Sequence, residues 1–334
     1  MATMRDVAAK AGVSMTTVSH VINQTRFVSE DLETRVREAI EELGYQPDHR
    51  ARSLRRGNSE TIAVVVSDVS NPFFPQVVRG IEDCARENGY SVLLTNTDEN
   101  PELEGRNLDL MIERRVDGFI IAPTTNALPR LERVTSQSIP VVVIDRQIDM
   151  EIDQVFSDNE QAAYAATRAL LELGHTKIGT IVELVGVASF DDRLAGYRRA
   201  MAEAGYESDL YVRQAGLELA GAYAAAKSLL SGPQPVTAIF GTNNLMTLGV
   251  LNYLKESGIG CPECVSVVGF DDPDWAVSFT PSITSIAQQP YEMGFQAASM
   301  LISRIEGDDS PARRVCLPCE LRIRESSGEC REKE

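Results

Sequence analysis

Residues 4–23, MRDVAAKAGVSMTTVSHVIN, carry the clearest signal for the structure of the N-terminal part of the chain. Apolar residues recur at helical spacing in the first half of this stretch, at Met4, Val7, Ala8 and Ala11. Gly12 can adopt the left-handed backbone that ends a helix, and Ser14 can cap the next helix. That second helix has its own apolar stripe, formed by Val18, Val21 and Ile22. Two helices joined by a short glycine-containing turn predict a helix-turn-helix, whose second helix reads the major groove of DNA.

The second helix presents polar side chains on the side opposite its apolar stripe. Thr16 and His20 project there, and Met15 and Ser19 flank them. A third helix, capped by Ser29, is expected to follow and to complete a three-helix head. Three short helices could also be no more than a small packed bundle, so the spacing alone favours DNA binding without establishing it.

The distribution of charge separates this head from the rest of the chain. The 334 residues carry a net charge of −17, which taken alone argues against nucleic-acid binding. Residues 1–57 hold nine Lys and Arg against eight Asp and Glu, or +1, which leaves 23 against 41, or −18, for the remainder. The acidic remainder would repel DNA phosphates, so any DNA contact is expected within the small head. The turn-prone residues 57–59 suit a linker between the two parts.

Composition and motifs exclude several other classes of protein. No run of about 18 apolar residues is present, which argues against a membrane span. The N-terminus lacks the apolar stretch of an export signal, and six cysteines without such a signal suggest reduced thiols in the cytoplasm. No Walker loop, GxGxxG, HExxH or GxSxG motif occurs. We therefore expect a cytoplasmic protein with no membrane partner, no catalytic residues and no cofactor.

After residue 60 the chain alternates between short apolar runs and helical patterns. The runs are residues 61–66, 91–94, 118–121, 141–144, 177–181, 238–240 and 265–270. Nearly continuous apolar runs of this length, separated by ten- to fifteen-residue helical patterns, are typical of parallel strands that are covered on both faces. The pattern predicts an α/β body of two doubly wound parallel-sheet units, split near residue 160.

Polar and aromatic residues follow several of these strands or begin a nearby helix. The candidates for ligand binding are Asn71, Phe73, Phe74, Asp145, Arg146, Arg193, Asn243, Asp271 and Gln288. Ligands of open α/β sheets bind beyond the carboxyl ends of the strands, where these residues are expected to converge. Carboxylates accept hydrogen bonds from hydroxyl groups, guanidinium and amide groups donate them, and aromatic faces cover the C–H side of a sugar ring. This set suits a neutral polyhydroxyl ligand, and it lacks the surplus of positive charge that a phosphorylated ligand would need.

Each of these candidates also has an ordinary structural alternative. Phe73 and Phe74 could belong to the core, Asp145 and Asp271 could cap helices or turns, and Arg193 could pair with a surface acid.

The residues of the head closely resemble a known family. Residues 4–14 and 17–23, continued by 42–47 and 51–54, resemble the head of the lactose-repressor (LacI/GalR) family. The resemblance implies that Met15, Thr16 and His20 contact base edges. It implies that phosphates are held by Ser14, Thr17, Ser19, Asn23 and Tyr45. His20 stands where many members of the family carry arginine, so a bidentate contact to guanine is lost and the operator is expected to differ at that base.

The same resemblance assigns a function to residues 47–56. They would form a helix of about two turns, which is too short to persist alone in water. In the family this hinge folds on the operator, where two copies pack side by side in the minor groove. Leu54 matches the residue that wedges between base steps and kinks the duplex, and Ala51 matches a small neighbour in the groove. For Leu54 the alternative is an ordinary interface leucine.

The body resembles periplasmic ribose-binding proteins, which share the fold of the repressor bodies. Their sugar contacts are matched by residues 71–74, 144–146 and 268–271, and by Arg193, Asn243 and Gln288. Leu217 stands where the ribose binders carry a third aromatic residue, which weakens the assignment to ribose more than the assignment to a sugar. Trp275 is a candidate for the missing aromatic wall, with a core or rim position as the alternative.

The resemblance also predicts the domain organisation. We expect a helix-turn-helix domain over residues 1–46, a hinge helix and linker over 47–60, an N-subdomain over 61–159 with about 288–316, and a C-subdomain over 160–287 with about 317–328. The C-terminal residues lack apolar heptads, so the tetramerising coiled coil of the lactose repressor is absent and a homodimer is expected.

The CxxC pairs at Cys261 and Cys316 have a spacing compatible with zinc, but the family has no metal there, and we expect none.

The sequence therefore predicts a transcriptional repressor that binds double-stranded operator DNA under the control of a small-molecule effector, namely a sugar. A purine or another small corepressor is the main alternative within this class. A sugar-binding transport protein would need an export signal in place of the head. An enzyme acting on sugars would need a catalytic constellation that the sequence does not show.

Overall fold

The computed structural model describes residues 2–23, 26–45, 58–183, 186–207 and 211–330. The chain forms two compact units, Met1–Ser59 and Glu60–Glu334, and each is described by itself. Ala51 and Leu54 of the predicted hinge lie outside the described residues. Among the helices that are described, none combines the length and the apolar composition needed to span a membrane.

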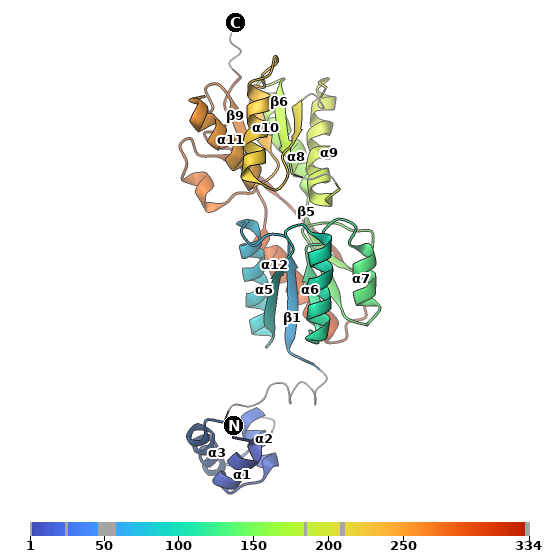
Figure 1. Cartoon of the computed structure of the whole chain (residues 1–334), viewed down its shortest axis with the longest axis vertical. Helices are drawn as coiled ribbons and strands as arrows, with labels where there is room; N and C mark the ends of the chain where they lie inside the picture. Colours follow the sequence, from blue (N-terminus) through green and yellow to red (C-terminus); the bar gives the residue numbers. More distant parts are fainter. Residues whose placement is uncertain (1, 24–25, 46–57, 184–185, 208–210, 331–334) are drawn as a thin grey trace. The chain divides into compact units, whose positions relative to one another are not determined.

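The first unit contains the three predicted helices (Figure 1). They are α1 (Met4–Ala11), α2 (Met15–Asn23) and α3 (Glu30–Leu43). Gly12 has a φ of +65° and ends α1, and the Ser14 hydroxyl accepts a hydrogen bond of 3.0 Å from the Thr17 amide at the start of α2. Ser29 occupies the capping position of α3, but its side chain makes no capping hydrogen bond, so that detail of the prediction is wrong. A small core built on Val7, Val18 and Val36 holds the three helices together.

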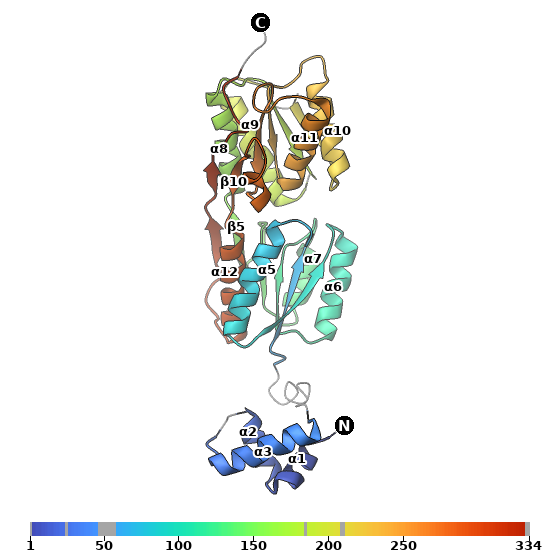
Figure 2. The same ribbon diagram turned by 90° about the vertical axis from the view of Figure 1, so that its left-hand side faces the viewer.

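The second unit begins with a six-stranded parallel sheet. Its strands are β1 (Thr61–Val66), β2 (Ser91–Asn96), β3 (Gly118–Ile121), β4 (Val141–Ile144), β5 (Asp153–Ser157) and β11 (Arg314–Leu317), in the order β11-β5-β4-β3-β1-β2. Helices α5 (Phe73–Glu87) and α12 (Pro290–Ile305) pack side by side on one face, as Figure 2 shows. The other face is covered by α6 (Pro101–Glu113) and α7 (Leu128–Thr135).

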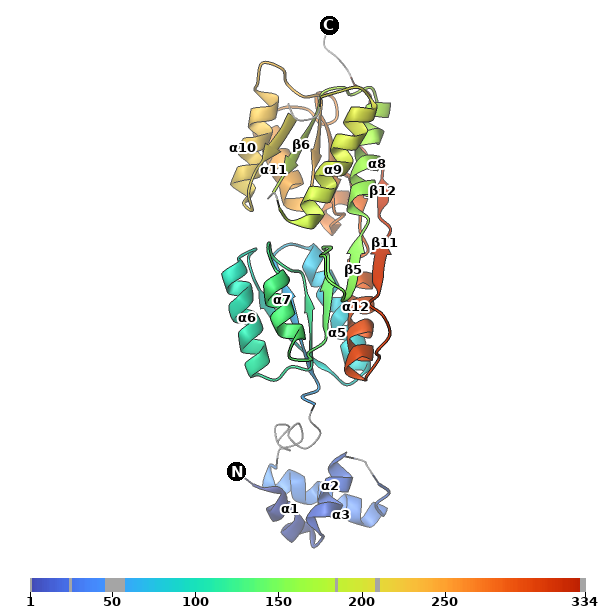
Figure 3. The ribbon, with the colours of Figure 1, turned by 90° about the vertical axis from the view of Figure 1, so that its right-hand side faces the viewer.

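A second sheet of the same kind follows. Its strands are β6 (Ile178–Val182), β7 (Val212–Gln214), β8 (Ala238–Gly241), β9 (Ser266–Phe270), β10 (Thr284–Ala287) and β12 (Glu320–Arg322). These strands pair in parallel, except that β12 pairs antiparallel with β10. Helices α8 (Asn159–Glu172) and α9 (Ala188–Glu203) cover one face, and α10 (Leu219–Leu230) and α11 (Asn244–Ser257) cover the other (Figure 3). A short 3-10 helix, η2 (Asp274–Val277), follows β9. The predicted fold class is confirmed.

The chain passes between the two sheets three times. The crossings join β5 to α8, β10 to α12 and β11 to β12. We propose that these crossings bound the two subdomains, with the last boundary at Pro318 because β11 extends to Leu317. Sequence patterning missed β5, since three of its five residues, Asp153, Gln154 and Ser157, are polar. The Asp153 carboxylate is nonetheless buried, because it pairs with Arg304 at 2.9 Å and with Arg313 at 3.0 Å.

Asp272, the second residue after β9, anchors the segment that follows the last crossing. Its carboxylate accepts hydrogen bonds from Arg324 at 2.6 and 2.8 Å, from Arg322 at 2.7 Å and from the Ser285 hydroxyl at 2.6 Å. Burial alone would raise the pKa of Asp272, but these donors outweigh it and lower the pKa to about 2. A carboxyl whose pKa is depressed in the folded state stabilises the protein above its unfolded pKa, and this contribution is lost as the pH falls through the folded pKa.

We therefore expect Asp272→Asn to lower the free energy of unfolding by roughly 2 kcal/mol at pH 7. Urea titrations of the variant and the unsubstituted protein should show this difference narrowing as the pH falls from about 4 towards 2. Asp274→Asn, which alters an exposed carboxylate in the same loop, is the matched control and should change little. A difference at pH 7 that persists unchanged at pH 2 would show that the carboxylate charge is not the cause.

Candidate functional site

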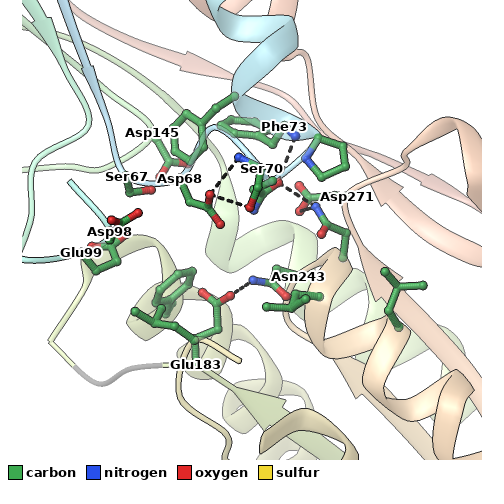
Figure 4. A pocket seen from close by; sticks show the side chains of 18 of the residues that line it. Ser67, Asp68, Ser70, Phe73, Asp98, Glu99, Asp145, Glu183, Asn243 and Asp271 are labelled. Atoms are coloured by element: carbon green, nitrogen blue, oxygen red, sulfur yellow. Dashed lines mark hydrogen bonds between the residues drawn. The ribbon is translucent and has the colours of Figure 1, made fainter. Parts of the chain in front are cut away.

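A cavity of about 610 Å³ lies between the two subdomains. Its volume falls within the range of small-molecule sites, about 300–1,000 Å³. The predicted ligand-binding residues all line it, namely Asn71, Phe73, Phe74, Asp145, Arg146, Arg193, Asn243, Asp271 and Gln288. They come from the segments that follow β1, β4, β8, β9 and β10, from the start of α5 and from α9; Figure 4 shows Phe73, Asp145, Asn243 and Asp271 among them. The polar ends of strands far apart in the sequence therefore meet at one place.

The aromatic pair at the start of α5 serves both the core and the cavity. The side-chain oxygen of Asn71 accepts a hydrogen bond of 3.0 Å from the Phe73 amide and so fixes the turn that leads into α5. The Phe73 and Phe74 rings meet edge to face with centroids 5.2 Å apart. Both belong to the core cluster of the N-subdomain and also line the cavity, so the two alternatives raised for them are not exclusive.

Arg146 is nearly saturated by the protein itself. It donates to both carboxylate oxygens of Glu99, to the Asp145 carboxylate at 3.3 Å and to the Pro123 carbonyl at 2.5 Å. Burial would lower the pKa of Arg146, but Glu99 and Asp145 outweigh it and raise the pKa. Burial raises the pKa of Asp145 in spite of the nearby arginines. Arg146 therefore holds two carboxylates in place and has little capacity left for a ligand.

Arg193 is anchored on one side and open on the other. Its Nε donates to the Asn159 side chain and its Nη1 to the Thr242 carbonyl, both at 2.8 Å. The guanidinium lies over the Phe270 ring at 3.7 Å from the centroid. No described residue accepts a hydrogen bond from its Nη2, although Arg193 is only 3% exposed. The alternative of a surface ion pair is therefore wrong, and Nη2 remains available to a bound molecule.

Asp271 links the two subdomains through neighbouring amides. The Asn244 side chain donates to Asn71 at 2.8 Å and to Asp271 at 3.3 Å, and the Gln288 side chain donates to Asp271 at 2.7 Å. The side-chain oxygen of Gln288 is buried without a hydrogen-bond partner among the described residues. Asp145 and Asp271, which directly follow β4 and β9, both have positive φ, 68° and 71°. Such backbone strain in non-glycine residues is typical of binding sites.

The prediction missed several residues of the cavity, among them Glu99, Glu183, Phe190 and Asn244. Phe190 lies one helical turn before Arg193. The centroid of its ring is 5.9 Å from the guanidinium carbon of Arg193 and 5.9 Å from that of Arg146. Glu183 directly follows β6, and Glu99 lies three residues beyond the end of β2. Extending the strand-end rule to these two strands would have found both glutamates.

Phe190 also supplies an aromatic wall that the prediction sought elsewhere. Trp275 does not line the cavity and instead packs against Phe279 and the C-subdomain core, so its candidate role in the site is wrong. Leu217, which occupies the expected aromatic position, does line the cavity.

The predicted DNA-contacting residues of the described head lie on α2, except Tyr45, which follows α3. Met15 and Thr16 are exposed, while Thr17, Ser19 and His20 are partly exposed. Tyr45 packs against the head core. Asn23 ends α2, and its side chain lies outside the described part of the chain.

The cysteines offer no evident metal site. In the described ranges, no group of three or more His, Cys, Asp or Glu side chains is arranged to hold a metal ion. Burial raises the pKa of Cys261 to about 12 and that of Cys319 to about 11, so both thiols remain protonated at neutral pH.

Comparisons with known proteins cover both units. Residues 3–48 match the model of bacterial regulatory proteins of the lacI family, and residues 59–325 match that of periplasmic binding proteins and the sugar binding domain of the LacI family. The chain is 35% identical over 320 residues to the HTH-type transcriptional repressor PurR of Aliivibrio salmonicida (strain LFI1238), covering 94% of this chain and 95% of the relative. It is 38% identical over 308 residues to the ribose operon repressor of Escherichia coli (strain K12), covering 91% and 93%.

A solved structure agrees with these matches. The Lac repressor dimer bound to operator and the anti-inducer ONPF aligns with a TM-score of 0.89 at 26% identity, covering 98% of this chain and 99% of that one.

Proposed function

The chain belongs to the LacI family of bacterial regulatory proteins, and we propose that its effector is a small sugar held in the cavity between the two subdomains. It is a DNA-binding repressor regulated by a small molecule, and repressors of this family function as dimers on operator DNA. The observation that carries the sugar assignment is the convergence of Arg193, Asp145 and Asp271 with three phenylalanines on one cavity.

The chemistry of this set matches a polyhydroxyl ring. Each sugar hydroxyl can donate to a carboxylate and accept from a guanidinium or an amide, so neighbouring hydroxyls are recognised by paired donors and acceptors. The open Nη2 of Arg193 supplies a donor, and the carboxylates of Asp145 and Asp271 supply acceptors. The rings of Phe73, Phe74 and Phe190 offer apolar faces to the C–H groups of the sugar. The relative named ribose operon repressor supports the same class of ligand.

A purine is the second candidate. The relative from Aliivibrio salmonicida is named PurR, and the three phenylalanines could also stack on a planar base. The sugar is favoured because carboxylates outnumber amides among the buried polar groups, and hydroxyl groups are the better partners for carboxylates.

We propose that base edges and phosphates of the operator are contacted by different residues, as the family implies. Met15, Thr16 and His20 would contact base edges, and the phosphates would be held by Thr17, Ser19, Asn23 and Tyr45. Leu54 and Ala51 would enter the minor groove from the hinge. A ligand that prefers one arrangement of the two subdomains needs only about 1–3 kcal/mol of coupling to change operator affinity. This mechanism requires no catalytic residue.

A thermal-shift panel of pentoses, hexoses, polyols and purines tests the ligand class. A true effector at about 100 times its dissociation constant should stabilise the fold by about 2.7 kcal/mol. Stabilisation by at least one sugar and by no purine supports the proposal. Stabilisation by a purine alone overturns the sugar assignment, and turnover of any stabilising sugar would indicate an enzyme instead.

A further inference from the structure

The cavity holds more negative charge than a neutral sugar requires. Counted in their ionised forms, the carboxyl groups of Asp145, Asp271, Glu99 and Glu183 exceed the two guanidinium groups of Arg146 and Arg193 by two negative charges. All six side chains are less than 10% exposed, so solvent does little to screen them. Buried charges are normally paired, because an isolated charge away from water is costly.

The arginines of the cavity do not provide the missing positive charge. Four of the five N–H groups of Arg146 donate hydrogen bonds to Glu99, Asp145 and a backbone carbonyl. Arg193 is anchored to an amide and a carbonyl, both of them neutral groups. Within the described residues, no salt bridge joins Glu183 or Asp271 to a basic side chain.

Glu183 is the carboxylate best placed to meet a ligand. It lies at the carboxyl end of β6 and is 5% exposed. The Asn243 side chain donates to its Oε1, and Asn243 in turn caps α11 through the Met246 amide at 2.8 Å, which fixes the orientation of both residues. No described residue donates to the other oxygen, Oε2. One oxygen is therefore held by the protein, and the other is open to the cavity.

Carboxylates face the cavity from both subdomains. Figure 4 shows Asp68, Asp98 and Glu99 on the side of the N-subdomain and Glu183 on the opposite side. Any closure of the cleft would bring these like charges together, which opposes closure unless positive charge lies between them. Burial is the main cause that raises the pKa of Glu183, to about 8, and the neighbouring Glu99 and Asp271 carboxylates contribute to the rise. A raised pKa is what we expect for a buried carboxyl group that has no cation beside it.

We propose that the effector is a polyhydroxyl compound with a protonated amine, such as an amino sugar or imino sugar, and that Glu183 selects it by pairing with the ammonium group. The inference rests on the proposed sugar effector and narrows its class. Arg193 and the two aspartates recognise the hydroxyl groups, while Oε2 of Glu183 accepts a charge-assisted hydrogen bond from the nitrogen. The ammonium group replaces the missing cation and allows the two acidic walls to approach each other.

Matched pairs of ligands test this proposal on the full-length dimer. The pairs are D-glucose and D-glucosamine, D-galactose and D-galactosamine, 1,5-anhydro-D-glucitol and 1-deoxynojirimycin, and 1,4-anhydro-D-ribitol and 1,4-dideoxy-1,4-imino-D-ribitol. Titration calorimetry at pH 7 should show an amine-bearing member binding at least about 10-fold more tightly than its neutral counterpart. Glu183→Gln keeps the shape of the side chain and an acceptor for Asn243, and it should reduce this preference to within about 3-fold without weakening the neutral compound.

Two further variants separate the effect of charge from that of folding. Glu183→Asp retains the carboxylate and should keep part of the preference. Glu218→Gln removes an exposed carboxylate from the same cavity wall and should leave the preference intact. Thermal unfolding without ligand should show all three variants folded.

The inference is overturned if no amine-bearing compound binds more tightly than its counterpart, or if the preference survives Glu183→Gln. The inference is also overturned if no amine-bearing compound binds at all. If neutral sugars still bind in that case, the proposed sugar effector stands while the amine is rejected. If only purines bind, the sugar effector itself is rejected.

Discussion

Arg193→Ala is expected to lower effector affinity by at least about 100-fold and to abolish the effector's influence on operator binding. The substitution removes the guanidinium whose Nη2 donates to no described residue, and it leaves the Asn159 side chain and the Thr242 carbonyl without their donor. Operator affinity in the absence of effector should be unchanged, because the residues proposed to contact DNA all lie before residue 60. Calorimetry with the effector and fluorescence anisotropy with labelled operator would measure the two affinities separately.

Arg199→Ala provides the matched control for this experiment. Arg199 lies on the same helix, but it pairs with Glu160 and packs over the Tyr164 ring, away from the cavity. Its replacement should leave effector affinity within about 2-fold. An unchanged effector response in Arg193→Ala would exclude Arg193 from the binding site. Thermal unfolding of both variants should also be measured, since loss of the fold would abolish effector binding and operator binding together.

Leu54→Ala is expected to weaken operator binding by about 10- to 100-fold, because a smaller side chain cannot hold the base step open. Leu54 lies outside the described residues, and the role proposed for it is the one that its resemblance to the LacI family implies. Effector affinity measured by calorimetry without DNA should remain within about 2-fold of the unsubstituted value.

Ser53→Ala, next to Leu54, is the control for a general disturbance of the hinge. An equal loss of operator and effector affinity in Leu54→Ala would refute the separation of DNA reading from effector binding. Retention of full operator affinity would instead assign Leu54 an ordinary interface position.

The parts of the fold that sequence predicted have strong local signals. Gly12 and Ser14 mark the helix-turn-helix because a left-handed turn and an N-cap require particular residues. Strands such as β1 and β4 are buried on both faces and therefore show as unbroken apolar runs. By contrast, β11 and β12 are short and partly exposed, and their place in the sheets depends on the distant strands β5 and β10.

The same distinction applies to the cavity. Asp145 and Asp271 were predictable because each directly follows an apolar run. Phe190 gave no signal of its own, since an aromatic residue in a helix usually indicates core packing. The saturation of Arg146 by Glu99 depends on two loops brought together by the sheet, so no local pattern could indicate it.

The most direct test measures operator affinity with and without the effector on one preparation of the full-length protein. An operator is first selected from a random duplex library at low ionic strength, and its dissociation constant is then measured by anisotropy with and without a saturating, fold-stabilising ligand. We expect tight, sequence-dependent binding that the ligand changes by about 5- to 150-fold. Failure to bind any duplex under either condition, or an affinity that no stabilising ligand alters, would contradict this expectation.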